Sequence, residues 1–74
     1  MLWIRTQDEK RLIKVMNIEV DGKKVEGVIG SGFLDSFNLG KYETHDRAVE
    51  VLNEILIKIE ESTRFSVTFV MPQK

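Results

Sequence analysis

One amphipathic helical pattern, at residues 44–62, constrains the fold of this chain more than any other feature. Apolar residues recur there at intervals of three and four, which places them along one face of a helix. These residues are Ala48, Val51, Leu52, Ile55 and Ile59. Thr44 is expected to cap the N-terminus, and Ile57 is expected to point away from the apolar face. Such a helix buries its apolar face against another element, which in this chain must be a sheet.

Five other segments show the alternation of apolar and polar residues that is typical of strands. They lie at residues 2–5, 11–20, 25–29, 33–39 and 65–71. The second segment is expected to be one continuous strand. Its side chains on one side are Leu12, Met16, Ile18 and Val20. Asp21-Gly22 then predicts a tight hairpin turn, because glycine tolerates a positive φ.

These elements predict an α+β fold in the order ββββαβ. Consecutive strands joined by short turns favour antiparallel pairing, so we expect a mainly antiparallel sheet of four to five strands with the one long helix packed on one face. No linker, repeat or low-complexity tract divides the sequence, and 74 residues leave no room for a second core. We therefore expect a single small domain over residues 1–74.

The last segment is the clearest strand, and its apolar side chains are expected to face one way. They are Phe65, Val67, Phe69 and Met71. A chain this short needs most of its large apolar side chains for its core, so we expect Phe65 and Phe69 to lie there. Trp3 and Tyr42 are the aromatic residues that we expect to be partly exposed.

Composition excludes several classes of protein. There is no cysteine and only one histidine, so neither a disulfide nor a zinc site is expected. The 11 basic and 12 acidic side chains give a net charge of −1, which is not the basic surplus of proteins that bind nucleic acid mainly through phosphates. The opening residues carry a charge by position 5, and no apolar run is long enough to span a membrane. We expect a cytoplasmic protein without metal, cofactor or membrane contact.

No motif in the sequence predicts catalysis. The run Gly27-Val28-Ile29-Gly30-Ser31-Gly32 lacks the order of a phosphate loop and is expected to be a turn between strands. His45 lies in the first helical turn, where we expect it to be exposed beside the cap. The carboxylates of the helix lie opposite its apolar face, where water solvates them. We therefore expect a protein that is not an enzyme and that has no catalytic, cofactor-binding or metal-binding residue.

Three stretches of the sequence resemble a family of short proteins of Gram-positive bacteria and their phages. They are WIRTQDEKRLIKV at 3–15, LGKYETHDRAVEVLNEI at 39–55 and FVMPQ at 69–73, so the resemblance extends over nearly the whole chain. That family usually opens with a motif like W-I-R-S-Q-D-K, and an acidic residue is common there where Arg47 stands here. The resemblance implies a bacterial or phage origin, and it transfers no activity and no site residue.

The middle stretch, 39–55, is also similar to the end of small sheet-plus-helix DNA-binding domains, those of plant ethylene-response factors and phage-type integrases. In those domains a sheet face rich in arginine and tryptophan reads DNA. The resemblance implies a partial counterpart of that face here, diluted by Glu19 and Glu26. Its candidate residues for nucleic-acid contact are Arg5, Arg11, Lys14, Lys23 and Lys24.

Two functions from different classes follow as hypotheses. The first is a small non-catalytic interaction module that associates with itself or with another protein, in a phage or host regulatory complex. A domain of this size without disulfide or metal often gains stability by association, and an apolar last strand attracts another chain if it lies at a sheet edge. The candidate interface residues are Ile57, Phe65, Val67, Phe69 and Met71. The alternative is nucleic-acid binding through the basic sheet face.

Overall fold

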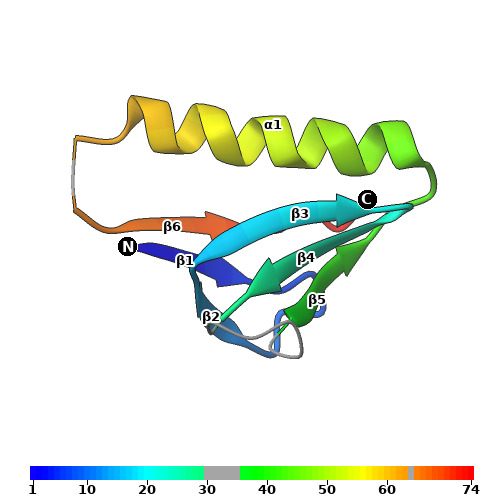
Figure 1. Ribbon diagram of the computed structural model, residues 1–74, viewed down its shortest axis with the longest axis horizontal. Helices are drawn as coiled ribbons and strands as arrows, with labels where there is room; N and C mark the ends of the chain where they lie inside the picture. The colour runs from blue at the N-terminus through cyan, green and yellow to red at the C-terminus, as the bar shows by residue number, and fades with distance from the viewer. Residues whose placement is uncertain (30–35, 64) are drawn as a thin grey trace.

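The computed structural model describes residues 1–29, 36–63 and 65–74, and over these residues the chain forms an α+β fold with one helix and six strands (Figure 1). The strands are β1 (Leu2–Arg5), β2 (Leu12–Val15), β3 (Asn17–Asp21), β4 (Lys24–Val28), β5 (Ser36–Lys41) and β6 (Val67–Val70), and the helix is α1 (His45–Glu61). The α+β class is confirmed, whereas the order is βββββαβ rather than ββββαβ. The break expected at residues 30–32 and the side chain of Phe33 lie outside the described residues.

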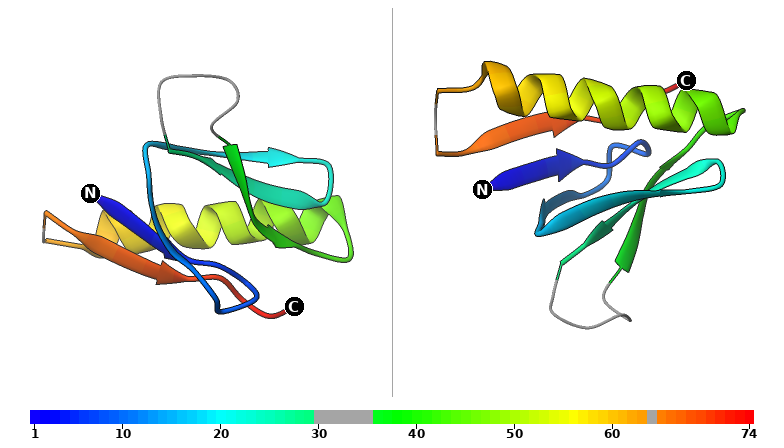
Figure 2. Two further views of the ribbon diagram at one scale, coloured as in Figure 1. Left: turned by 90° about the horizontal axis from the view of Figure 1, so that it is seen from below. Right: turned by 45° about the horizontal axis from the view of Figure 1, so that its top comes forward.

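The described strands form two three-stranded sheets rather than the single sheet that the sequence predicts. In the first sheet β1 lies between β2 and β6, and in the second β4 lies between β3 and β5. The pairs β1–β2, β3–β4 and β4–β5 are antiparallel, as their short connections predict. The helix contacts β3 and β4 of one sheet and β6 of the other, so it covers parts of both (Figure 2).

A bend at Met16 divides the predicted strand 11–20 into β2 and β3 and so creates the two sheets. The alternation of inward and outward side chains shifts by one residue across this bend. The inward side chains are Ile13 and Val15 before the bend and Ile18 and Val20 after it. Leu12 and Met16, which are predicted to lie on the same side as Ile18, are exposed instead. The prediction is wrong here because a straight strand with a period of two cannot turn Val15 and Ile18 to the same face.

The last strand, β6, pairs parallel with β1, where the sequence predicts mainly antiparallel pairing. Leu2 lies opposite Val67, and Arg5 lies opposite Val70. The direction follows from α1, which ends at the same end of the molecule at which β1 begins (Figure 1). The chain that leaves α1 must therefore run in the same direction as β1. Because β1 occupies the centre of its sheet, β6 lies at an edge.

The helix agrees with the predicted range 44–62 to within one residue at each end. Thr44 is the N-cap, and its side-chain oxygen accepts a hydrogen bond of 3.0 Å from the backbone N–H of Arg47. The buried residues of the apolar face are Ala48, Val51 and Ile55. Leu52 is only half-buried and Ile59 is 43% exposed, because this part of α1 borders a groove instead of resting fully on a sheet.

The core joins the helix to both sheets. Its largest fully buried side chains are Ile4, Leu39, Ile55, Met71, Val25 and Val51. Gly27 on β4 allows the two sheets to approach each other, because a Cβ atom there would lie 2.6 Å from Cγ1 of Val15 on β2. The absence of a side chain at Gly27 is therefore a packing requirement.

Two aromatic side chains lie where the sequence does not predict them. Tyr42 is buried in the core rather than partly exposed, and Phe65 is 99% exposed rather than buried. Phe65 precedes β6, so the alternation of the strand does not direct its side chain inward. Trp3 is half-buried, in agreement with the prediction.

The β3–β4 hairpin turns at Gly22, whose φ of 61° confirms the predicted Asp21-Gly22 turn. Two hydrogen bonds attach this hairpin to the start of α1. The backbone N–H of Tyr42 donates to the carbonyl oxygen of Lys23 at 2.9 Å, and Nδ1 of His45 donates to the carbonyl oxygen of Gly22 at 2.7 Å. His45 is exposed beside the cap, as predicted, and it has a structural contact there.

Candidate functional site

An apolar groove lies between the C-terminal half of α1 and the bend that separates β2 from β3. Its volume is about 830 Å³. The exposed apolar side chains that line it are Met1, Met16, Leu56, Ile59 and Phe65. These side chains come from distant parts of the sequence, and the bend at Met16 and the position of α1 bring them together. The volume is in the range of sites that receive small ligands or partner side chains.

The lining of this groove is mostly apolar. Lys14, Asn17 and Asn53 are the polar residues among the described lining residues, and the rest are apolar. Two of the exposed lining residues are methionines, whose flexible side chains adapt to differently shaped partners. No imidazole, hydroxyl or carboxylate is found among the described lining residues. The groove can therefore hold apolar groups.

The structure separates the five residues that the sequence suggests for a protein interface. Phe65 and Val67 line the groove. Phe69 is half-buried against the core, and Met71 is buried within it, so the side chain of Met71 does not face a partner. Ile57 is exposed, as the helical rotation predicts, but it lies on the side of α1 that points away from the sheets. Only Phe65 and Val67 of this set therefore belong to the groove.

A second surface is the outer face of the sheet β2-β1-β6. Ile4 of β1 is buried in the core, so its neighbours Trp3 and Arg5 point to the opposite face. The strand pairings place two rows of side chains on this face. One row is Lys14, Trp3 and Thr68, and the other is Leu12, Arg5 and Val70. Figure 2, seen from below, shows this sheet in front of α1, with its outer face free of the helix.

The five cations suggested for nucleic-acid contact do not form one basic face. Arg5 and Lys14 lie together on the outer face of the first sheet. The guanidinium carbon of Arg11 lies 5.4 Å from the ring centre of Phe37, a residue of the second sheet. Lys24 belongs to β4 of the second sheet, and Lys23 lies in the turn that precedes it. The structure therefore places two of the five candidates on the same face as Trp3.

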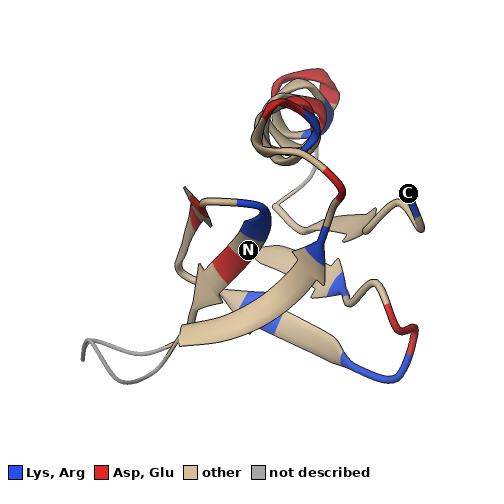
Figure 3. Cartoon of the chain, turned by 90° about the vertical axis from the view of Figure 1, so that its right-hand side faces the viewer, with Lys and Arg blue, Asp and Glu red and all other residues tan. Residues whose placement is uncertain are grey.

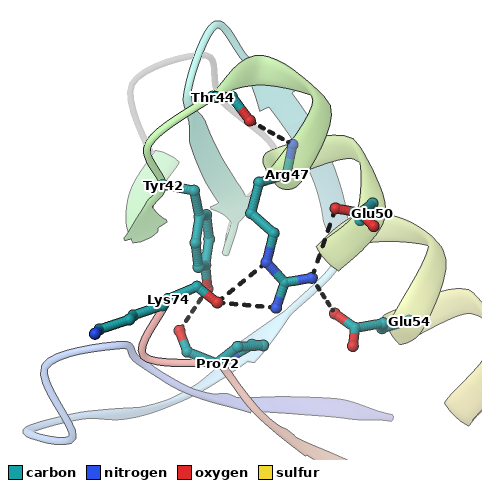
Figure 4. Close-up of polar contacts among 7 residues, drawn as sticks. All are labelled: Tyr42, Thr44, Arg47, Glu50, Glu54, Pro72 and Lys74. Carbon is teal, nitrogen blue, oxygen red and sulfur yellow. Dashed lines mark hydrogen bonds and ion pairs between the residues drawn. The ribbon is translucent and has the colours of Figure 1, made fainter.

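Residues of the middle and last resemblance stretches meet beside the start of α1 (Figure 4). The hydroxyl of Tyr42 donates to the carbonyl oxygen of Pro72 at 2.9 Å. The guanidinium of Arg47 donates two hydrogen bonds, of 2.9 and 3.1 Å, to the main-chain oxygen of Lys74. It also lies 3.4 Å from the carboxylate of Glu54. Arg47 thus holds the last residues of the sequence against the helix.

Gln7 links the opening stretch to the same region. Its Nε2 donates to the carbonyl oxygen of Gln73 at 2.9 Å, and Nε2 of Gln73 donates back to the carbonyl oxygen of Gln7 at 2.8 Å. Oε1 of Gln7 accepts a third hydrogen bond, of 2.8 Å, from the backbone N–H of Lys41. Gln7, Lys41 and Gln73, one residue from each resemblance stretch, therefore lie side by side, and their contacts tie three segments of the fold together.

Two ionisable side chains near these contacts have shifted pKa values. Burial raises the pKa of Tyr42 to about 12, an effect that the nearby positive charge of Arg47 partly opposes. The hydrogen bonds from the hydroxyl of Thr6, at 2.6 Å, and from the backbone N–H of Lys10 lower the pKa of Asp8. Both groups are engaged in contacts within the fold, so their shifts are structural.

Within the part of the chain that the structure describes, no group of three or more His, Asp or Glu side chains could hold a metal ion. No helix among these residues is both long and apolar enough to cross a membrane. No protein-family model matches the chain, and the searches of curated proteins and of solved structures gave no significant match. The two family resemblances seen in the sequence therefore stay predictions.

Proposed function

We propose that this protein is a small non-catalytic interaction module that associates with a second copy of itself through the apolar groove. The observation that carries the proposal is the cluster of five exposed apolar side chains that line one concavity. Soluble monomers rarely expose a contiguous apolar patch of large area, and such patches often mark sites of association. A domain of 74 residues without disulfides also has much to gain from additional burial.

Phe65 favours a second copy as the occupant. This side chain is 99% exposed and lies at the groove, so a projecting aromatic group stands beside a concave apolar surface. A two-fold interface joins the same patch of both subunits, and a patch that has both a projection and a hollow can be complementary to itself. In this arrangement Phe65 of each subunit enters the groove of the other, where Met16 and Leu56 can adjust around it.

The expected dimer is weak. Burying the exposed half of a large apolar side chain contributes about 1 kcal/mol. In a two-fold dimer both subunits bury the same side chains, so each contributes twice. The loss of translational and rotational freedom on association costs at least about 4 kcal/mol. We therefore expect a dissociation constant in the micromolar range, which dilution can reach.

Sedimentation velocity over about a hundredfold dilution tests this proposal. The mass should fall from that of a dimer toward the monomer mass of 8.6 kDa. Phe65→Glu should be monomeric at every concentration, because a carboxylate loses its hydration in an apolar groove without gaining a partner. The side chain of Phe65 is fully exposed, so circular dichroism should show an unchanged fold.

Leu56→Glu and Ile57→Glu form a matched pair of controls. The two side chains are adjacent on α1 and are 52% and 53% exposed, but only Leu56 lines the groove. Leu56→Glu should dissociate the dimer, and Ile57→Glu should leave it intact. A native protein that stays monomeric throughout overturns the proposal. Dissociation by Ile57→Glu alone also overturns it, since the interface would then lie on the outer side of α1.

A further inference from the structure

The outer face of the sheet β2-β1-β6 carries side chains that self-association through the groove does not explain. Trp3 is the only tryptophan of the sequence and lies on the central strand β1. Lys14 stands directly opposite it on β2, and Thr68 stands opposite it on β6. Arg5 lies two residues further along β1, on the same face. A large aromatic side chain thus has two cationic neighbours on this face of the sheet.

The core does not account for the position of Trp3. The inward side chains of β1 are Leu2 and Ile4, of which Ile4 is completely buried. Trp3 points the other way and is half-buried. The open face of a sheet needs only polar residues for its solvation. Tryptophan at such a place has the apolar surface and the flat ring of a contact residue.

The charges of this face indicate what it binds. Its two rows of side chains include Arg5 and Lys14 and no carboxylate, although the whole chain has a net charge of −1. Acidic residues colour the part of the α1 ribbon that lies away from the sheets (Figure 3). Glu19 and Glu26, which the sequence suggests as diluting charges, face each other on the second sheet. The face around Trp3 therefore favours an anionic ligand.

We propose that this face binds single-stranded nucleic acid, with one base stacked on Trp3 and neighbouring phosphates on Arg5 and Lys14. Arg5 and Lys14 occupy diagonal positions of the β1–β2 pair, whose backbone positions are typically about 7–8 Å apart, and Trp3 is the neighbour of both. A nucleic-acid strand combines flat rings with single negative charges in the same way. Unpaired bases can stack on an aromatic side chain, whereas the bases of a duplex are already stacked on one another. The occupant is thus a single strand rather than a duplex.

Trp3 itself can report the binding, because no other tryptophan contributes to the emission. The experiment titrates the full chain with an oligothymidylate of about 12 nucleotides in ~50 mM salt and follows tryptophan fluorescence. Saturable quenching is expected with the single strand, and no quenching is expected with a duplex of the same length. With two phosphate contacts, a plot of the logarithm of the association constant against the logarithm of the salt concentration should have a slope of about −1.4.

Fluorescence anisotropy of a labelled oligonucleotide extends the test to variants. Trp3→Ala should weaken binding about 5- to 150-fold, and Trp3→Phe should retain most of it. Arg5→Ala should reduce the salt slope to about −0.7, since one phosphate contact remains. Lys24→Ala, which removes an exposed cation from the second sheet, is the matched control and should leave the affinity unchanged. Circular dichroism checks the fold, and if Trp3→Ala does not fold, Arg5→Ala and Lys14→Ala decide the question.

Three outcomes overturn the proposal. The first is no binding at tens of micromolar protein in this salt, where even non-specific binders register. The second is equal or tighter binding of the duplex, because a base cannot then be stacked on Trp3. The third is an equal loss of affinity in Arg5→Ala and Lys24→Ala, which would mean that the strand responds to general charge and not to this face.

Discussion

Replacing Gly27 with alanine tests how closely the two sheets approach each other. A Cβ atom at this position would lie 2.6 Å from Cγ1 of Val15 and 3.1 Å from Cδ1 of Leu39. Contacts below 3.0 Å are essentially never made by real Cβ atoms, so something must move to admit the new methyl group. Val15 cannot easily move its methyl group, because it is buried and its β-branched side chain has few accessible rotamers.

The expected cost of Gly27→Ala follows from two opposing effects. Overpacking of a core costs about 1–3 kcal/mol, whereas the loss of backbone freedom in the unfolded chain stabilises the variant by about 0.4–1 kcal/mol. The net loss should be about 1–2 kcal/mol. A domain of 74 residues has a stability of about 4–11 kcal/mol, so this is a substantial share. The midpoint of thermal unfolding should fall by about 4–8 °C per kcal/mol.

Urea denaturation of a double-mutant cycle provides the assay. Val15→Ala removes the methyl group that the new Cβ would meet, so it should cost less in the Gly27→Ala background than in the native chain. The coupling between the two substitutions measures the contact directly. An unchanged midpoint for Gly27→Ala would refute the close approach of the sheets. It would also be refuted if the costs of Gly27→Ala and Val15→Ala were additive in the double variant.

Three further predictions concern the core and the contacts around the start of α1. Ile55→Ala should cost about 2–5 kcal/mol in urea denaturation, and Ile59→Ala should cost less than half of that, because Ile59 is 43% exposed; equal costs would contradict the groove. The raised pKa of Tyr42 means that its neutral form contributes stability below about pH 10, and that this contribution is lost as pH rises through about 12. As the pH rises from about 10 to about 12, the urea midpoint should therefore fall by more in the native chain than in Tyr42→Phe. An equal fall in both proteins would contradict the prediction. Gln7→Ala removes two side-chain hydrogen bonds, to Gln73 and to Lys41, and should speed hydrogen exchange at the amide of Lys41 without unfolding the domain; unchanged exchange would show that these bonds contribute little.

The helix is predictable from the sequence because its signals are local. The spacing of Ala48, Val51 and Ile55 defines the buried face, and Thr44 defines the start. The hairpin at Gly22 is predictable for the same reason, since the turn needs a residue that tolerates a positive φ. Each of these features depends on residues that lie close together in the sequence.

The division into two sheets is not predictable from alternation alone. Assigning residues 11–20 to one strand places Lys14 on the same side as Leu12 and Met16, and this interruption was a signal of the bend. A pattern in which Val15 and Ile18 both face the core fits the sequence as well as the single continuous strand does. Which of the two patterns holds depends on how Val15 of β2 packs against Gly27 of β4, a contact between residues that are 12 positions apart in the sequence.

The candidate surfaces are predictable in part. Alternation along β1 puts Trp3 and Arg5 on one face, but the position of Lys14 beside them depends on the register of β2, which the loop at 6–11 determines. Helical rotation correctly predicts that Ile57 is exposed. It says nothing about a concavity, because the groove exists only where α1 passes the bend at Met16.

The two proposed surfaces can be tested separately by substitution, because they have only Lys14 in common among the described residues. Leu56→Glu should abolish the dimer and leave the affinity for the oligonucleotide unchanged, whereas Arg5→Ala should weaken oligonucleotide binding and leave the dimer intact. Lys14→Ala should affect oligonucleotide binding directly, and any effect on the dimer would reveal coupling between the surfaces. By thermodynamic linkage, such coupling must also appear as a shift of the dimer equilibrium when the oligonucleotide is added. If one adhesive patch accounted for both activities, Leu56→Glu and Arg5→Ala would each reduce both, and the assignment of two surfaces would be wrong.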